Sequence, residues 1–343
     1  MFAACSDLLA PLAGLITERN AAAGHLHVDE TSWQVFAAVE GKDSHRWWCW
    51  VFVGPDTTVF RIAPSRSLAV LTEQLGIDTD DDTDTLTLPE GRQLLLSSDF
   101  YTVYQSLGRL DGVDNLWCWA HIRRYFIRAG DAHPELAAWA AGWVERIAAL
   151  YAAHTALGAA TPASSTHTMA AAQFSAALNT IDAERRAQSS HPELLHPAAA
   201  KVLATGGPGM GRAGPAPRVP RTPPGQQHLR EGATRTGDRA QELLRLRLGG
   251  LRAAGQPSLT ITATAERAGL NPLTYLKAYL DECALAGGTA PHGQALTRFL
   301  PWAAGTDDLT AWDNSPRPNP DPNANTTGND ARSPDHPHTG PAP

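Results

Sequence analysis

The chain has 343 residues, of which 43% are hydrophobic and 18% are charged, and its formal net charge is -7. This length allows one large or two modest domains, each with a substantial core. No stretch reaches the roughly 20 consecutive apolar residues of a membrane-spanning helix, and the start lacks the basic-then-apolar layout of a secretory signal. These features argue against a membrane or secreted protein and predict a soluble, cytoplasmic one.

Two segments depart from this average composition. Residues 206–258 contain nine Arg, no Lys, three acidic residues, 11 Gly and 7 Pro, which gives a local charge of +6. Residues 315–343 contain eight Pro and almost no apolar side chains, so they bury too little surface to offset their chain entropy. We expect both segments to be disordered.

The first part of the chain predicts a mixed α/β domain. Alternating apolar residues and Gly-containing turns favour three antiparallel strands at 26–39, 46–53 and 58–62. The elements expected next, in chain order, are a helix capped by Ser65 that ends at Leu75, an acidic loop at 78–84, a strand at 93–97, a helix at 101–107 and a strand at 115–119. This order matches a ribonuclease-H-like fold, in which a mixed sheet presents acidic side chains at neighbouring strand ends.

Helical periodicity replaces the strand pattern after residue 133. Apolar side chains recur at three- and four-residue spacing from Pro134 onward, and a second helix is expected at 169–186. The expected organisation is a ribonuclease-H-like core at 1–133, an inserted helical region at 134–205, the abnormal segment at 206–258, a C-terminal helical region at 259–302 and a disordered tail at 303–343.

Two acidic residues occupy positions that suit metal chemistry. Asp29 lies in the first expected strand, and Asp99 follows the fourth. Carboxylates from adjacent strands repel each other and favour a divalent cation, which two-metal phosphoryl transfer uses. The same spacing also suits a solvent-facing Asp29 and an Asp99 that caps the helix at 101–107, because Asp is a preferred cap. Spacing alone favours neither interpretation.

Three ordered motifs resemble one family. They are His-Val-Asp-Glu-Thr-Ser-Trp at 27–33, Ser-Asp-Phe-Tyr-Thr-Val-Tyr at 98–104 and Cys-Trp-Ala-His-Ile-Arg-Arg-Tyr-Phe at 118–126. Together with both flanks, they resemble the insertion-sequence-sixty-six transposases over about residues 6–205 and 259–302. These are DDE recombinases with a ribonuclease-H-like core, which hydrolyse a DNA strand at a transposon end and join the freed 3′-hydroxyl to target DNA.

By this resemblance, Asp29 and Asp99 are the first two catalytic, metal-binding carboxylates, Mg²⁺ or Mn²⁺ is the cofactor, and transposon ends and target DNA are the partners. A homo-oligomer is a further expectation. The family's third carboxylate is a Glu in an Asp-Asn-Asn-x-x-Glu-Arg motif, which this chain lacks, so the third carboxylate stays unassigned. The acidic residues that lie at or beyond the inserted region are Glu145, Glu184, Glu231, Glu242 and Glu266.

Codons that can encode the abnormal segment yield the missing motif when their reading frame is shifted by one base. Residues 225–232 can then encode Asp-Asn-Asn-Thr-Ser-Glu-Arg, so we interpret residues 206–258 as an out-of-frame reading between two compensating indels, which the gene's nucleotide sequence tests. A genuine basic linker that contacts DNA phosphates is the alternative. The chain also begins almost at the core, without the N-terminal DNA-recognition region that the family leads us to expect.

The segment at 118–124 holds two further sets of candidates. Arg123 and Arg124 begin a predicted helix and can contact phosphates, although charged helix faces are commonly just solvated. Cys118 and His121 have the spacing of half a zinc site without a second half, which favours a buried thiol beside a histidine.

The motifs together lead us to interpret the chain as a DDE-type transposase core that is weak or inactive with this sequence. A non-catalytic remnant that binds DNA or joins mixed oligomers is the alternative.

Overall fold

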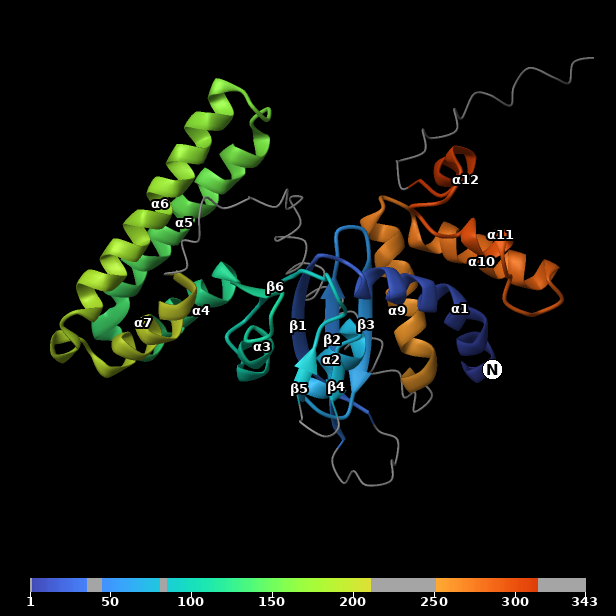
Figure 1. Cartoon of the computed structure of the whole chain (residues 1–343), viewed down its shortest axis with the longest axis horizontal. Helices are drawn as coiled ribbons and strands as arrows, with labels where there is room; N and C mark the ends of the chain where they lie inside the picture. The colour runs from blue at the N-terminus through green and yellow to red at the C-terminus, as the bar shows by residue number, and fades with distance from the viewer. Residues whose placement is uncertain (1, 36–44, 81–84, 211–250, 314–343) are drawn as a thin grey trace, which may run out of the picture.

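The computed structural model describes residues 2–35, 45–80, 85–210 and 251–313, and a five-stranded sheet lies at its centre (Figure 1). The strand order is β3-β2-β1-β6-β7. The strands are β1 (His25–Gln34), β2 (Arg46–Val53), β3 (Thr58–Ala63), β6 (Leu94–Ser98) and β7 (Val113–Trp117). Strands β1, β2 and β3 are antiparallel, whereas β6 runs parallel to β1 and β7 parallel to β6. The predicted mixed α/β class is confirmed.

The strand bounds follow the period-2 pattern of the sequence. In β2, Trp50 and Phe52 point to a core that Leu26 and Val28 of β1 share, while Cys49 packs on the opposite face with Trp33 and Phe60. Strand β1 ends at Gln34, short of the expected 39, and residues 36–44 lie outside the described part. The acidic loop expected at 78–84 is wrong for its first residues, because β4 (Asp78–Asp80) pairs with β5 (Thr85–Thr87), which follows the loop.

The main core lies between the sheet and five helices. They are α1 (Phe2–Ala21), α2 (Leu68–Leu75), α3 (Thr102–Leu107), α9 (Leu251–Arg267) and α10 (Pro272–Leu285). Helix α2 begins later than expected: Ser67 is its N-cap residue, and Ser65 instead forms a hydroxyl–hydroxyl hydrogen bond of 2.8 Å with Ser67. Helix α1, which the sequence analysis did not predict, packs along α9.

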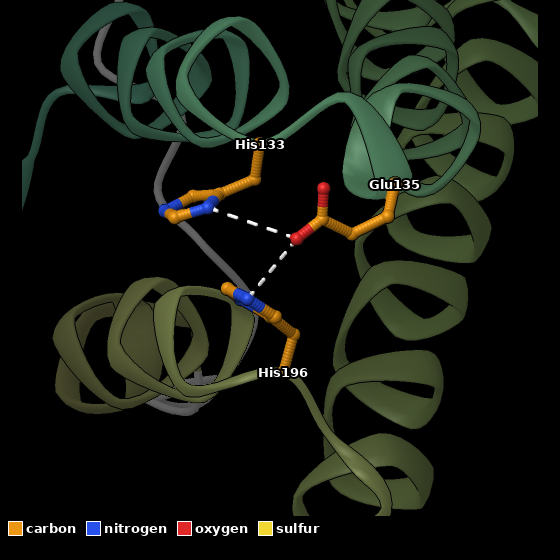
Figure 2. A group of neighbouring side chains, drawn as sticks. All are labelled: His133, Glu135 and His196. Atoms are coloured by element: carbon orange, nitrogen blue, oxygen red, sulfur yellow. Dashed lines mark ion pairs between the residues drawn. The ribbon is translucent and has the colours of Figure 1, made fainter.

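A second core is built by the helices that extend away from the sheet (Figure 1). They are α4 (Trp119–Ala132), α5 (Ala137–Ala159), α6 (Ser165–Ser189) and α7 (Pro197–Met210). The short helices η1 (Pro134–Leu136) and η2 (Pro192–Leu194) connect α4 to α5 and α6 to α7. Trp143 is fully buried and stacks on Phe126 at 4.7 Å between ring centroids. Figure 2 shows the corner where η1 meets the start of α7.

Helix α9 covers the β3 edge of the sheet with side-chain hydrogen bonds. The Thr264 hydroxyl accepts from the Thr58 N–H at 3.1 Å and donates to the Thr58 carbonyl at 3.2 Å. Gln256 Oε1 accepts from the Ile62 N–H at 2.7 Å. These contacts correct the limit of the abnormal segment, because residues from 255 onward belong to a helix that packs on the core. Residues 206–210 of that segment also form a helix, because they are the end of α7, and residues 211–250 lie outside the described part.

The C-terminal part of the described chain extends the main core further than expected. Helices α11 (Gln294–Thr297) and α12 (Thr306–Ala311) follow α10, and Trp312 is buried against Phe299. The expected disordered tail at 303–343 is therefore wrong for residues 303–313, since burial of this indole offsets the entropy of ordering the segment. Residues 314–343 lie outside the described part. None of the helices described is both long and apolar enough to cross a membrane.

Candidate active site

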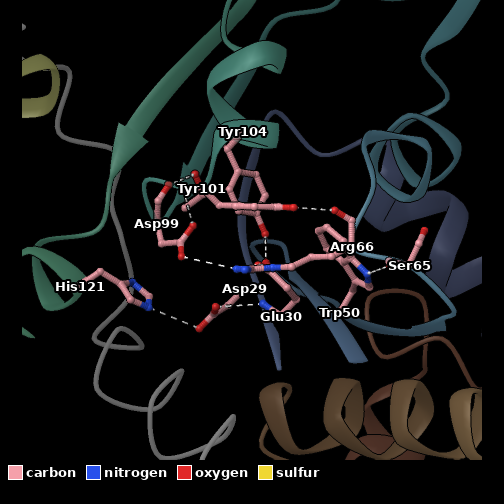
Figure 3. Close-up of polar contacts among 10 residues, drawn as sticks. Asp29, Glu30, Trp50, Ser65, Arg66, Asp99, Tyr101, Tyr104 and His121 are labelled. Atoms are coloured by element: carbon pink, nitrogen blue, oxygen red, sulfur yellow. Dashed lines mark hydrogen bonds and ion pairs between the residues drawn. The ribbon is translucent and has the colours of Figure 1, made fainter. Parts of the chain in front are cut away.

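Asp29 and Asp99 lie at the point where β1 and β6 separate. The parallel ladder pairs His25 with Leu95 and His27 with Ser97, and continuing this register by two residues puts Asp29 level with Asp99. Strand β6 ends at Ser98, while β1 continues beside β2 to Gln34. Adjacent strands are about 4.8 Å apart, so the geometry brings the two predicted carboxylates together, as Figure 3 shows.

The electrostatics of Asp29 show that the two carboxylates interact. The pKa of Asp29 is raised to about 6, chiefly by loss of hydration and in smaller part by the Asp99 carboxylate. The Glu30 N–H, which donates to Asp29 Oδ1 at 2.9 Å, acts in the opposite direction, as do the charges of Arg124 and Arg66. Because its side chain stays 46% exposed, Asp29 remains accessible to an ion from solvent.

Asp99 accepts a backbone hydrogen bond and also lies in the charged cluster around Arg66. Its Oδ1 accepts a hydrogen bond of 2.9 Å from the Tyr101 N–H, while Tyr101 itself is the N-cap residue of α3. The expected capping role is therefore only partly correct: Asp99 orders the turn before the helix. Its second oxygen, Oδ2, lies 3.9 Å from the Arg66 guanidinium. Phe100, the next residue, enters the second core and stacks on Trp117.

Glu30 is a site residue that the sequence analysis did not single out. Its side chain is completely buried, accepts hydrogen bonds from Arg66 and the Tyr104 hydroxyl, and forms an ion pair with Arg66. Burial raises the pKa of Glu30, whereas Tyr104 and Arg66 act to lower it. The Arg66 guanidinium also lies over the Tyr101 ring, 3.8 Å from its centroid. Glu30 thus holds Arg66 beside Asp99.

One feature of the sequence could have pointed to Glu30: it is a second acidic residue, directly after Asp29, in a strand. In a strand, successive side chains point to opposite faces. Asp29 and Glu30 therefore face opposite sides of β1, and only an inward-facing partner can stabilise the second carboxylate. The partner, Arg66, lies in the turn before α2, and the sequence of a turn does not show in which direction its side chains point.

The N-terminus of α4 forms the third side of the cluster. Cys118 is its N-cap residue, as expected from the junction between strand and helix, and His121 Nε2 lies 3.8 Å from Asp29 Oδ2. Burial acts to raise the pKa of the Cys118 thiol, but the neighbouring His121 and backbone N–H groups outweigh this and lower it. Arg124 is exposed and close enough to act on Asp29, whereas Arg123 is half-buried.

The structure brings none of the described candidates for the third carboxylate to this cluster. Glu145 and Glu184 lie on helices α5 and α6, where Glu184 pairs with Arg146 at 3.6 Å. Glu266 is exposed on α9, and Glu231 and Glu242 lie outside the described residues. Within the described part of the chain, the acid nearest to the two aspartates in the network is Glu30, whose charge is already paired with Arg66.

The arrangement suits a hard divalent cation at Asp29 and Asp99. Two neighbouring carboxylates repel each other and are stabilised by a cation between them, and Mg²⁺ and Mn²⁺ prefer carboxylate oxygens. The raised pKa of Asp29 and its accessible side chain fit such an ion. The exposed Arg124 supplies a positive charge beside the aspartates, which suits contact with an anionic substrate.

Comparison with known proteins links this chain to one family. The model of the transposase IS66 family matches residues 1–206, which include β1, β6 and the start of α4. No curated protein and no solved structure matches the chain.

Proposed function

The chain belongs to the transposase IS66 family, and from this premise we propose that it is a DDE-type transposase core with a ribonuclease-H-like sheet that cleaves and transfers DNA strands. The observation that carries the proposal is the register that puts Asp29 and Asp99 side by side where β1 and β6 separate. The strand order and directions, with three antiparallel strands followed by two parallel ones, support the same proposal.

In this proposal, Asp29 and Asp99 hold Mg²⁺ or Mn²⁺, which, when bound, activates the attacking oxygen and stabilises the leaving one. The chain's own residues orient the site. The Tyr101 N–H fixes one Asp99 oxygen, and the buried Glu30 holds Arg66 beside the other. We assign Arg124, with Arg123 beside it on α4, to contacts with DNA phosphates, because guanidinium groups bind phosphate oxygens in a bidentate way.

We further propose that this copy is catalytically impaired. A site with two carboxylates holds two cations poorly, because each divalent ion needs several oxygen ligands. Glu30 does not replace the missing ligand, since both of its oxygens are engaged by Arg66 and Tyr104. The out-of-frame interpretation of the missing motif remains part of the proposal, with its C-terminal limit moved to before Gln256, because Gln256 packs on β3.

The test is strand cleavage on a plasmid that carries the gene with its genomic flanks, where the element's ends lie. We expect the chain to show weak or no nicking with Mg²⁺ or Mn²⁺, and any nicking to disappear in Asp99→Asn but to persist in Asp114→Asn. Asp114 is the matched control because it is an exposed aspartate on neighbouring β7. Efficient cleavage that depends on Asp99 would contradict the impairment and support the site, whereas nicking that survives Asp99→Asn would contradict the site.

A non-catalytic remnant is the second candidate, and the absence of the Asp-Asn-Asn-x-x-Glu-Arg motif from the sequence favours it. Such a chain would act only by binding DNA or by forming mixed oligomers with intact transposase. A mobility-shift titration with the same flanking DNA at increasing salt separates the two, because phosphate contacts weaken steeply with salt. Binding without cleavage at any metal concentration supports the remnant, and cleavage above the background of Asp99→Asn excludes it.

A further inference from the structure

Three side chains that could bind a metal converge at the end of α4 away from the aspartates (Figure 2). His133 is the C-cap residue of α4, Glu135 lies in η1, and His196 directly precedes α7. His196 Nε2 lies 3.3 Å and His133 Nδ1 lies 3.8 Å from the same oxygen, Glu135 Oε1. One ligand atom of each residue lies within 4.8 Å of the others.

These separations suit a tetrahedral ion. Zinc bound at about 2.0–2.1 Å by nitrogen and oxygen ligands keeps neighbouring ligand atoms roughly 3.3–3.4 Å apart. The separations of His196 Nε2 and His133 Nδ1 from Glu135 Oε1, 3.3 and 3.8 Å, are already close to this spacing. The side chains of His133, Glu135 and His196 are 39%, 60% and 30% exposed, so they can adjust by fractions of an ångström and solvent can supply a fourth ligand.

The backbone around the three residues is ordered by contacts that need no ion. The His133 N–H donates to the Ala129 carbonyl, and its own carbonyl accepts from the Leu136 N–H at 2.8 Å. The His196 carbonyl accepts from the Ala200 N–H at 3.0 Å. Beneath them, Ala129, Leu136 and Ala199 form a small buried cluster that packs η1 against α7. The ligand positions are therefore fixed before binding, which lowers the entropic cost of forming a site.

Binding through His196 Nε2 has one identifiable cost. The Ala198 N–H donates to His196 Nδ1 at 3.2 Å, so the neutral ring carries its proton on Nε2, where it faces Glu135. An ion on Nε2 moves this proton to Nδ1 and breaks the hydrogen bond from Ala198. That N–H belongs to the first turn of α7, where N–H groups lack helical partners and water can replace the lost acceptor.

We propose that His133, Glu135 and His196 form a site for a divalent transition metal ion, with Zn²⁺ as the fitting ion. Two imidazoles and one carboxylate are ligands typical of zinc and poorly suited to Mg²⁺. The ion joins the corner after α4 to the start of α7 and so closes the chain around the α5–α6 hairpin. The 14 residues of α4, at about 1.5 Å each, separate this site from the aspartates.

The test uses the full-length chain, stripped of metal with a chelator and titrated with ZnCl₂ by calorimetry. We expect one Zn²⁺ per chain to bind at this site, and the affinity to fall at least tenfold in His133→Ala, in His196→Ala and in Glu135→Gln. Zn²⁺ should also raise the melting temperature of the wild type but not of these variants. His191→Ala is the matched control, because His191 pairs with Glu193 at 3.3 Å on the surface without a second histidine.

The double variant Asp29→Asn/Asp99→Asn separates this proposal from the proposed function. Its Zn²⁺ affinity should equal that of the wild type, whatever the result of the cleavage assay. Absence of Zn²⁺ binding in the wild type overturns the site. Binding that survives His133→Ala and His196→Ala places the ion elsewhere and overturns it as well. Glu135→Gln, which changes an exposed side chain without loss of volume, guards against variants that fail to fold.

Discussion

Neighbouring residues on one strand acquire opposite roles at this site. Asp29 faces the solvent-accessible side of β1, where it lies level with Asp99, while Glu30 points into the protein and is completely buried. A buried carboxylate is stable only when a partner replaces its hydration. Arg66 and Tyr104 do so for Glu30, whereas Asp29 has the Glu30 N–H, His121 at 3.8 Å and more distant positive charges. Asp29, whose lost hydration is only partly replaced, is therefore the carboxylate that is available to a cation.

The raised pKa of Asp29 predicts a pH-dependent effect on stability. Its ordinary value is 3.8 and its folded-state value is about 6, so between these limits the folded chain binds more protons than the unfolded chain. The contribution of Asp29 to the free energy of unfolding therefore falls as pH rises through this range. Asp29→Asn removes the ionisation and keeps an oxygen for the Glu30 N–H.

We expect Asp29→Asn to be more stable than the wild type at pH 7.5 by on the order of 1 kcal/mol, a value reduced to allow for solvent screening of a half-exposed group. Near pH 3, where the wild-type carboxyl is protonated when folded, the difference should vanish. Urea unfolding in the presence of chelator measures both values. A difference that is the same at the two pH values would show that ionisation of Asp29 is not its cause.

At the scale of elements, the sequence predicted those parts whose neighbours are close in the chain. The apolar alternation of β2 and the helical segment after Pro134 could be predicted directly, because short turns and one-sided periodicity determine them. The limits of β1 and α2 were less accurate, since Ser67 rather than Ser65 begins the helix and Arg66 is used by the site.

The start of helix α9, before the helical region expected from residue 259, shows why other parts could not be predicted. Its first residues include Gly255 and Pro257, which disfavour a helix when considered alone. The helix is stabilised instead by packing on α1 and by side-chain hydrogen bonds to the exposed edge of β3, which lies about 200 residues earlier. Contacts at such separation leave no local pattern. The same holds for Trp312, whose burial extends the fold beyond residue 303.

The edge contact of α9 predicts a measurable loss of stability in Thr264→Val. This change preserves the shape of the side chain but leaves the Thr58 N–H and carbonyl without the partner that Thr264 supplies. Buried unpaired groups cost about 1–3 kcal/mol each, so we expect a loss of about 2–3 kcal/mol in the free energy of unfolding.

Thr262→Val is the matched control on the same helix. The Thr262 hydroxyl hydrogen-bonds only to carbonyls of α9 itself, with Ser258 O at 2.8 Å, so its loss should change stability by less than about 0.5 kcal/mol. Equal effects of the two substitutions in urea unfolding would show that the β3 contact contributes nothing of its own.

At the scale of the whole molecule, the candidate site lies between two cores. Phe100 and α4 contribute to the core of the helical region, whereas Tyr104 is part of the main core and hydrogen-bonds to Glu30. Asp99 stands at this boundary, so the position of the helical region influences the geometry of the site. The sequence predicted both aspartates, but it could not show Glu30, Arg66 and His121 around them, because these converge from separate elements.

The central claim is that Asp29 and Asp99 together bind a divalent cation, and Mn²⁺ titration followed by electron paramagnetic resonance of the free ion tests it most directly. The titration uses the His133→Ala/His196→Ala variant, which lacks the second metal site. Mn²⁺ should bind to this variant. Its affinity should fall at least tenfold with Asp99→Asn and stay unchanged with Asp114→Asn. Mn²⁺ binding that is equally strong with and without the Asp99 carboxylate would contradict the account.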